Sequence, residues 1–167
     1  MTEWRVLSDV ALVELVERLR SLKWSWLIED FPSLADEFGW RVEMSDTSWV
    51  MFESGFGMGS GKVLGRDGRA NTIRVRITDF VDEGNRGRGQ TRDAFARFTT
   101  VLSATLGDPS TRRPGEIPEV RWAGPDTTLL LRDLEVSVVL ELVTNSSLAL
   151  QDLAAELPDE GLDDENI

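Results

Sequence analysis

The chain has 167 residues, of which 41% are hydrophobic, and a formal net charge of −12. This length fits one domain that buries a single two-layer core. Cysteine and histidine are both absent, which excludes disulfides, thiolate metal sites, thiol nucleophiles and the side chain that most often shuttles protons or binds zinc. We therefore expect a binding protein that is not an enzyme and that uses no cofactor and no metal.

The negative charge is unevenly distributed along the sequence. Residues 1–61 carry 11 acids and 5 bases, residues 62–132 carry 9 acids and 13 bases, and residues 133–167 carry 10 acids and no base. An acidic field of this kind repels nucleic acids and anionic membranes, and it accelerates the encounter with basic proteins. The expected partner is therefore a basic protein, with no nucleic acid and no membrane involved.

The first residues, Met-Thr-Glu-Trp-Arg-Val-Leu, lack the basic and apolar regions of a signal peptide. No apolar run approaches the roughly 18 residues needed to cross a bilayer. We therefore expect a cytoplasmic protein.

The hydrophobic periodicity of the first half predicts two helices followed by strands. Leucine and valine recur every three or four residues after Asp9, and Pro32 and Gly39 bound a second, shorter helix. From Trp40 the period changes to two, which is typical of strands. The predicted elements are helices at 9–22 and 31–39 and strands at 40–44, 49–53, 62–64 and 70–80.

The second half follows a loosely similar plan, a helix and then strands, although no repeat of fixed period is visible. After a polar, flexible connection at 82–89, an apolar stripe from Ala94 to Leu106 predicts a helix that ends before Gly107. The proline-rich segment 110–118 is predicted to be a loop. Strands are expected at 120–123, 127–131 and 135–143, and a last helix at 146–157.

Runs of adjacent strands, without regular alternation with helices, indicate an α+β fold in which helices cover one face of an antiparallel sheet. We expect about six strands, in the order ααβββ(β)αβββα. A single domain is predicted over residues 1–157. The acidic residues 158–167 are predicted to form a disordered tail.

No motif for phosphate binding or catalysis is complete. The glycine-rich run 55–62 differs from the phosphate-binding loop G-x-x-x-x-G-K-[ST], because Phe56 and Val63 occupy positions that need Gly and Ser or Thr. We interpret this run as a hairpin loop. Arg86 and Arg88, which lie between glycines, are interpreted as part of a solvated loop because no aromatic residues accompany them.

The predicted C-terminal hairpin is the most suggestive surface for a partner. Alternation turns the valines and leucines at even positions from 136 to 142 inward, and it leaves Glu135 and Glu141 on the opposite, solvent-exposed face. Asp133 lies at the turn of this hairpin. We therefore expect Asp133, Glu135 and Glu141 to contact a partner. The alternative, in which these acids only keep the surface soluble, stays open at this point.

Six tryptophans and no tyrosine make up an unusual set of aromatic residues. Trp40, Trp49 and Trp122 lie on strand patterns and are expected in the core. Trp24 and Trp26 flank the link between the first two helices, and one of them is expected to be exposed as an interface anchor.

Six short segments carry a resemblance to known proteins: WRVL at 4–7, WSW at 24–26, FGW at 38–40, LGDP at 106–109, VRW at 120–122 and TLLL at 128–131. Together they resemble a small actinobacterial family of unknown function whose members are often suspected of being immunity proteins of polymorphic toxins. The resemblance spans about residues 4–155, and its motifs are structural, not catalytic. The order of elements is also similar to that of type III secretion chaperones, which pack helices on an antiparallel sheet.

The family resemblance implies an immunity protein that binds a cognate basic toxin domain and covers its active site, as a monomer in the complex. The likeness to chaperones implies instead a protein that binds an exported partner, as a homodimer. A ligand-binding domain or an uncharacterised enzyme is the third alternative. It would need an apolar pocket with convergent polar groups.

Overall fold

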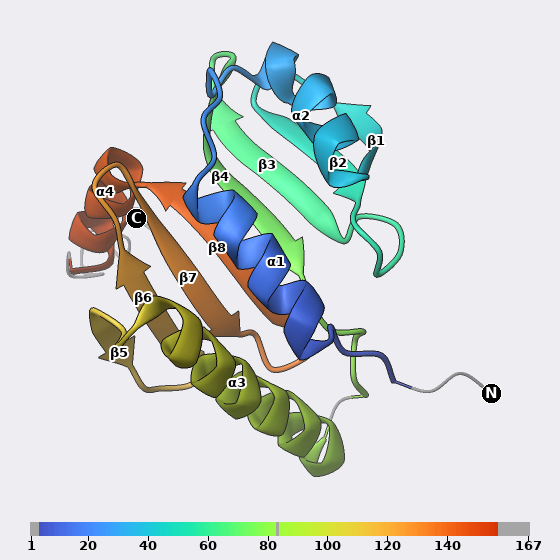
Figure 1. Cartoon of the computed structure of the whole chain (residues 1–167), viewed down its shortest axis with the longest axis vertical. Coiled ribbons are helices and arrows are strands. Elements are labelled where there is room, and N and C mark those ends of the chain that lie inside the picture. Colours follow the sequence, from blue (N-terminus) through green and yellow to red (C-terminus); the bar gives the residue numbers. More distant parts are fainter. Residues whose placement is uncertain (1–3, 83, 157–167) are drawn as a thin grey trace, which may run out of the picture.

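Residues 4–82 and 84–156 are described by the structure, which is a computed structural model. Their centre is one antiparallel sheet of eight strands in the order β1-β2-β3-β4-β8-β7-β6-β5 (Figure 1). The strands are β1 (Arg41–Ser45), β2 (Trp49–Glu53), β3 (Gly61–Arg66), β4 (Arg69–Arg76), β5 (Thr111–Arg113), β6 (Glu119–Ala123), β7 (Thr127–Asp133) and β8 (Val138–Thr144). The helices are α1 (Asp9–Arg20), the short 3-10 helix η1 (Ile28–Asp30), α2 (Phe31–Phe38), α3 (Asn85–Leu106) and α4 (Asn145–Glu156).

The sheet consists of two halves with the same plan. Each half begins with helix and continues as a meander of four strands, β1 to β4 in the first and β5 to β8 in the second. The last strands of the two meanders, β4 and β8, pair in the middle of the sheet, with Arg74 opposite Glu141. The first strands, β1 and β5, are therefore the two outer edges.

The expected class, an α+β fold with an antiparallel sheet, is confirmed, but the expected count of about six strands is wrong. β5 lies in the proline-rich segment that was predicted to be a loop, and its Thr111 and Arg113 pair with β6. A three-residue edge strand has few buried side chains, so it leaves no alternating apolar pattern in the sequence. β3, which the sequence marks only weakly, is a full strand of six residues.

The helix α3 begins at Asn85, so the segment 82–89 is largely helical and the expected flexible connection is wrong. Gly87 is buried in the first turn of this helix, where a Cβ atom would come within 1.9 Å of the carbonyl oxygen of Asp82. Glycine therefore allows the helix to pack closely on the preceding segment. Of the glycines that suggest a flexible loop in the sequence, Gly87 thus serves close packing.

One face of the sheet is covered by α1, α2 and α3 (Figure 1), and the main hydrophobic core lies between them. Because apolar residues recur every three or four positions, each long helix turns a single stripe toward the sheet. The buried stripes are Leu12, Val16 and Leu19 on α1 and Ala94, Phe98 and Leu102 on α3.

The glycine-rich run leads into β3, where Gly61 packs against the hydrophobic core. Phe52 of β2 lies between Phe31 and Trp40, with ring centroids 5.0 and 4.7 Å away. A Cβ atom on Gly61 would lie 2.1 Å from the Phe52 ring, so only glycine fits at this position. The predicted hairpin loop is confirmed, because β2 and β3 on its two sides pair antiparallel.

The last helix, α4, lies on the opposite face of the sheet, which corrects the expectation that all helices share one face. Its Leu148 packs against Leu130 and Val143. One turn further along, Asp152 accepts two hydrogen bonds of 2.8 Å from the guanidinium of Arg121. These hydrogen bonds hold the pKa of Asp152 below its usual value. Apolar packing and an ion pair together thus attach α4 to the sheet.

The predicted tail at 158–167, and the predicted end of the domain at 157, lie outside the described residues. Within residues 4–82 and 84–156, no helix has both the length and the apolar character needed to cross a membrane. The one sheet runs through both halves of the chain.

Replacing Asp152 with Asn tests how α4 is attached. The variant loses the carboxylate that accepts both hydrogen bonds from Arg121, and we expect the free energy of unfolding to fall by about 1–3 kcal/mol at pH 7. Because the pKa of Asp152 is lowered in the folded state, its contribution is present above about pH 4 and is lost as the pH falls through the folded-state pKa. Urea denaturation at pH 7 and at pH 3 measures the difference.

The control is Glu156→Gln, because Glu156 is exposed in the same helix. We expect it to change the free energy of unfolding by less than about 0.5 kcal/mol. If Asp152→Asn lowers the free energy of unfolding by the same amount at pH 7 and at pH 3, this account of the ion pair is contradicted.

Candidate functional site

The five residues predicted to bind a partner lie in three different parts of the structure. Glu141 lies in β8, on the face of the sheet opposite α1, α2 and α3, which we call the back face. Asp133 and Glu135 lie at the turn between β7 and β8, near the start of α3. Trp24 and Trp26 lie in the link between α1 and α2. Of the five, only Asp133 and Glu135 lie together at one candidate binding site.

Glu141 is buried, so its predicted position on a solvent-exposed acidic face is wrong. It is 4% exposed, accepts a hydrogen bond of 2.6 Å from Arg74, and lies 3.5 Å from Arg132. The alternation along β8 is as predicted, with Leu140 and Leu142 in the main core. The opposite face, however, is covered as well, and Glu141 stabilises the sheet there.

Glu141 belongs to a series of seven charged residues on the back face, which we call the charge ladder. Arginines and acids alternate along it, and each of its three carboxylates contacts two arginines. With four arginines and three acids, the ladder offers no acidic surface to a basic partner, and the long arginine side chains cover the strands beneath them. Its members, in order, are Arg74, Glu141, Arg132, Glu119, Arg121, Asp152 and Arg113.

A groove of about 370 Å³ lies between the first turns of α3, the loop before β6 and the turn between β7 and β8. We call it the α3 groove. It contains the predicted acids Asp133 and Glu135, and a third acid, Glu116, that the sequence analysis missed. Glu116 lies in a proline-rich loop without any periodic pattern, so no signal in the sequence places it there. The other side chains that line the groove include Arg88, Thr91, Arg92, Phe95 and Pro118.

The turn after β7 places Asp133 in the groove. Glu135 has a φ angle of 76°, a left-handed conformation that is uncommon for residues other than glycine. The Oδ1 atom of Asp133 accepts a hydrogen bond of 2.9 Å from the backbone N–H of Glu135, which stabilises this conformation. Because β8 begins only at Val138, Val136 is exposed, and its predicted inward position is wrong.

Asp133 is 7% exposed, yet it forms no ion pair within residues 4–82 and 84–156. Arg88, which lines the same groove, lies 3.5 Å from Glu135 instead. A buried carboxylate without a counter-charge is unfavourable, and a cation placed beside it relieves the cost. The α3 groove is therefore suited to bind a positively charged group.

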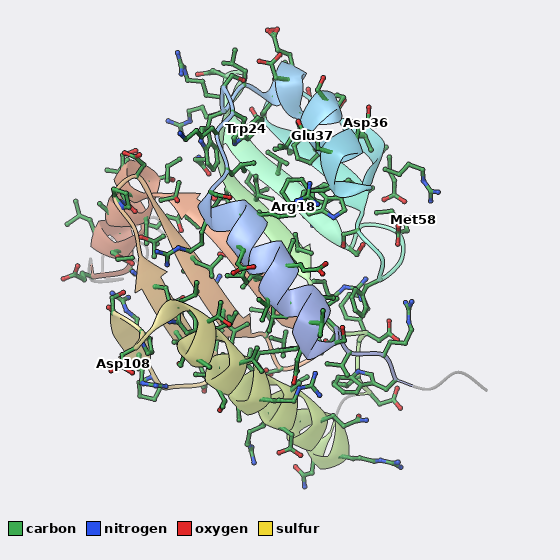
Figure 2. All side chains as sticks on the ribbon, viewed as in Figure 1. Arg18, Trp24, Asp36, Glu37, Met58 and Asp108 are labelled. Atoms are coloured by element: carbon green, nitrogen blue, oxygen red, sulfur yellow. The ribbon has the colours of Figure 1, made fainter. Side chains whose placement is uncertain are left out.

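Trp24 and Trp26 are both partly buried and pack against the main core, so neither stands out as a separate exposed anchor. Their ring centroids are 5.1 Å apart. Trp24 lines a second groove of about 390 Å³ beside Arg18 and Glu37, all three of which are labelled in Figure 2. Its indole N–H has no acceptor within the described part of the chain.

An apolar surface remains uncovered on the back face of β1, β2 and β3, and we call it the β1–β3 patch. Met44 is 56% exposed and lies opposite Met51, while Leu64 is 36% exposed and lies opposite Trp49. Lys62 lies beside Met51 and adds a positive charge. Among residues 4–82 and 84–156, neither a helix nor the charge ladder covers this part of the sheet, so its apolar side chains are available to a partner.

No group of three or more acidic side chains in the described residues is arranged to hold a metal ion. The fold and these surfaces define an α+β protein built on one eight-stranded antiparallel sheet, with an acid-lined groove beside α3. Residues 10–144 match the model of DUF6301, a family of unknown function, and the chain belongs to this family. No curated protein and no solved structure matches the chain. The resemblance to immunity proteins and to chaperones stays a prediction.

Charge reversal separates the acids of the ladder from those of the groove. We expect Glu141→Lys to lower the free energy of unfolding by about 3–5 kcal/mol, because it places a third positive charge beside the arginines Arg74 and Arg132. Glu135→Lys, at the mouth of the α3 groove, should change it by less than about 1 kcal/mol. Chemical denaturation of both variants measures the difference, and equal losses would contradict the assignment of Glu141 to the structure.

Proposed function

We propose that this protein is an immunity protein, which binds a cognate basic toxin domain and covers its active site. It acts through surface complementarity, without catalysis and without a cofactor. The observation that carries the proposal is the α3 groove, in which the buried Asp133 forms no ion pair with a described residue and Glu116 and Glu135 add further acids. A basic partner supplies the missing positive charge and gains both speed and specificity of association from it.

The charge ladder supports this choice of surface. Its acids are already neutralised by arginines, so the back face of β6, β7 and β8 gives a basic toxin little to bind. Asp133 is the buried acid whose charge is left for a partner. The overall charge of −12 then attracts a basic protein from a distance, and the groove fixes its position at contact.

The proposal is tested by expressing each protein encoded beside this gene, with and without this protein, in a bacterial host. We expect one neighbour to stop growth and this protein to restore it through a one-to-one complex. Growth curves and the mass of the purified complex are the measurements. If none of the neighbours is toxic, or if the toxic one does not bind, the immunity role is wrong.

Electrostatic docking is tested on that complex with the double variant Glu116→Lys and Glu135→Lys. We expect association to slow by about tenfold or more at low salt, and the difference from the parent protein to shrink as salt is added. Stopped-flow kinetics measures both effects. The matched control reverses two exposed acids elsewhere in the same half, Asp108 and Asp126. If the control slows association equally, general attraction and not the groove explains the rate.

A secretion-chaperone-like role is the second candidate, and the β1–β3 patch favours it. An uncovered sheet face with exposed methionine and leucine can hold an extended apolar segment of an exported protein. In that role the protein would be a homodimer. The double variant Met44→Glu and Leu64→Glu would then abolish binding while the groove variant binds normally; the immunity role predicts the reverse.

A further inference from the structure

We infer that the α3 groove binds a single arginine side chain of the partner protein. The inference rests on the proposed function and adds the chemical identity of the group that enters the groove.

Three acidic residues are buried in the described part of the chain: Glu119, Asp133 and Glu141, which are 9%, 7% and 4% exposed. Glu119 and Glu141 each contact two arginines of the charge ladder. Asp133 is equally buried but forms no ion pair with a described residue. The fold thus pairs two of its three buried acids with guanidinium groups and leaves the third, which lines an open groove, without one.

One oxygen of Asp133 is free to accept a hydrogen bond. Its Oδ1 atom accepts the N–H of Glu135, whereas no described residue donates to Oδ2. A buried carboxylate that retains acceptor capacity is a strong partner for a charged donor, because charge-assisted hydrogen bonds are shorter and stronger than neutral ones. The second oxygen therefore gives an incoming cation a defined position.

The walls of the α3 groove suit a long basic side chain. Phe95 and Pro118 are partly buried and offer apolar contacts to a methylene stem, while Glu116 and Glu135 lie with Asp133 along the same groove. Arginine fits better than lysine, because its planar guanidinium donates to several acceptors at once and is less strongly hydrated than an ammonium group. The two neutralised buried acids of this protein also contact arginines and not lysines.

The arginines of the groove itself do not neutralise Asp133. Arg88 lies 3.5 Å from Glu135, and both Arg88 and Arg92 are exposed. Their two positive charges offset two of the three acids that line the groove, which leaves an excess negative charge for an incoming cation. Selection then depends on the hydrogen-bond geometry at Asp133, which favours a guanidinium group.

The test uses the full chain and the probe Nα-acetyl-arginine N-methylamide, together with its lysine and citrulline counterparts. Citrulline has nearly the shape of arginine but no charge. We expect the arginine probe to bind with a dissociation constant of about 1 mM, as a single side chain can. It should shift the amide NMR signals of Thr91 and Glu135, lysine should bind more weakly, and citrulline should give no saturable shift.

The variant Asp133→Asn removes the charge but keeps the Oδ1 acceptor for the N–H of Glu135. We expect it to bind the arginine probe about tenfold or more weakly, and the control Asp126→Asn to bind like the parent protein. Thermal denaturation checks that Asp133→Asn is folded. If it is not, the comparison of arginine with citrulline on the parent protein decides, together with the variant Glu135→Gln at the partly exposed mouth of the groove, which should weaken binding several-fold.

Equal binding of arginine and citrulline, or equal binding by Asp133→Asn and the parent protein, would overturn the inference. Its failure is distinguishable from failure of the proposed function. A toxin complex that forms equally well with Asp133→Asn removes the arginine site and leaves the immunity role. An arginine probe that binds as expected, in a protein that protects against none of its neighbours, leaves the site and removes the immunity role.

Discussion

The antiparallel pairing of β4 with β8 joins residues 67 positions apart, such as Arg74 and Glu141, and it is the contact on which the rest of the structure depends. Each four-stranded meander can form from local turns, but the two meanders become one sheet only through this pair. The pairing continues beyond the strands, where the N–H of Ile77 donates to the carbonyl of Val138. It thereby fixes the position of the turn after β7, which forms one wall of the α3 groove.

The two halves of the sheet share a plan but differ in what covers their back faces. In the second half α4 and the charge ladder cover it, and β7 and β8 accordingly read as nearly continuous apolar runs, as expected for strands buried on both sides. In the first half the back face is bare at Met44 and Leu64. The same topology therefore yields a closed, charge-balanced surface in one half and an exposed apolar one in the other.

The contact between arginine and carboxylate has two uses in this protein. On the back face it neutralises Glu119 and Glu141 and lets polar residues lie between packed strands. In the α3 groove the buried carboxylate of Asp133 forms no ion pair with a described arginine, so the same interaction becomes available to another molecule. A buried ion pair completed within one chain stabilises a fold, and one completed across an interface contributes to recognition.

The sequence by itself determined the amphipathic helices, most of the strands, the hairpin loop of the glycine-rich run and the antiparallel class of the sheet, because periodicity and turn residues act over a few positions. It also placed Asp133 at the turn of the C-terminal hairpin, although it put Glu135 in the following strand, which begins only at Val138. Only the tertiary structure decided that β5 completes the sheet, that α4 crosses to the back face and that Glu141 is neutralised there. Periodicity shows that the two faces of a strand carry different side chains. What covers each face depends on contacts between residues 31 to 67 positions apart, which periodicity does not reveal.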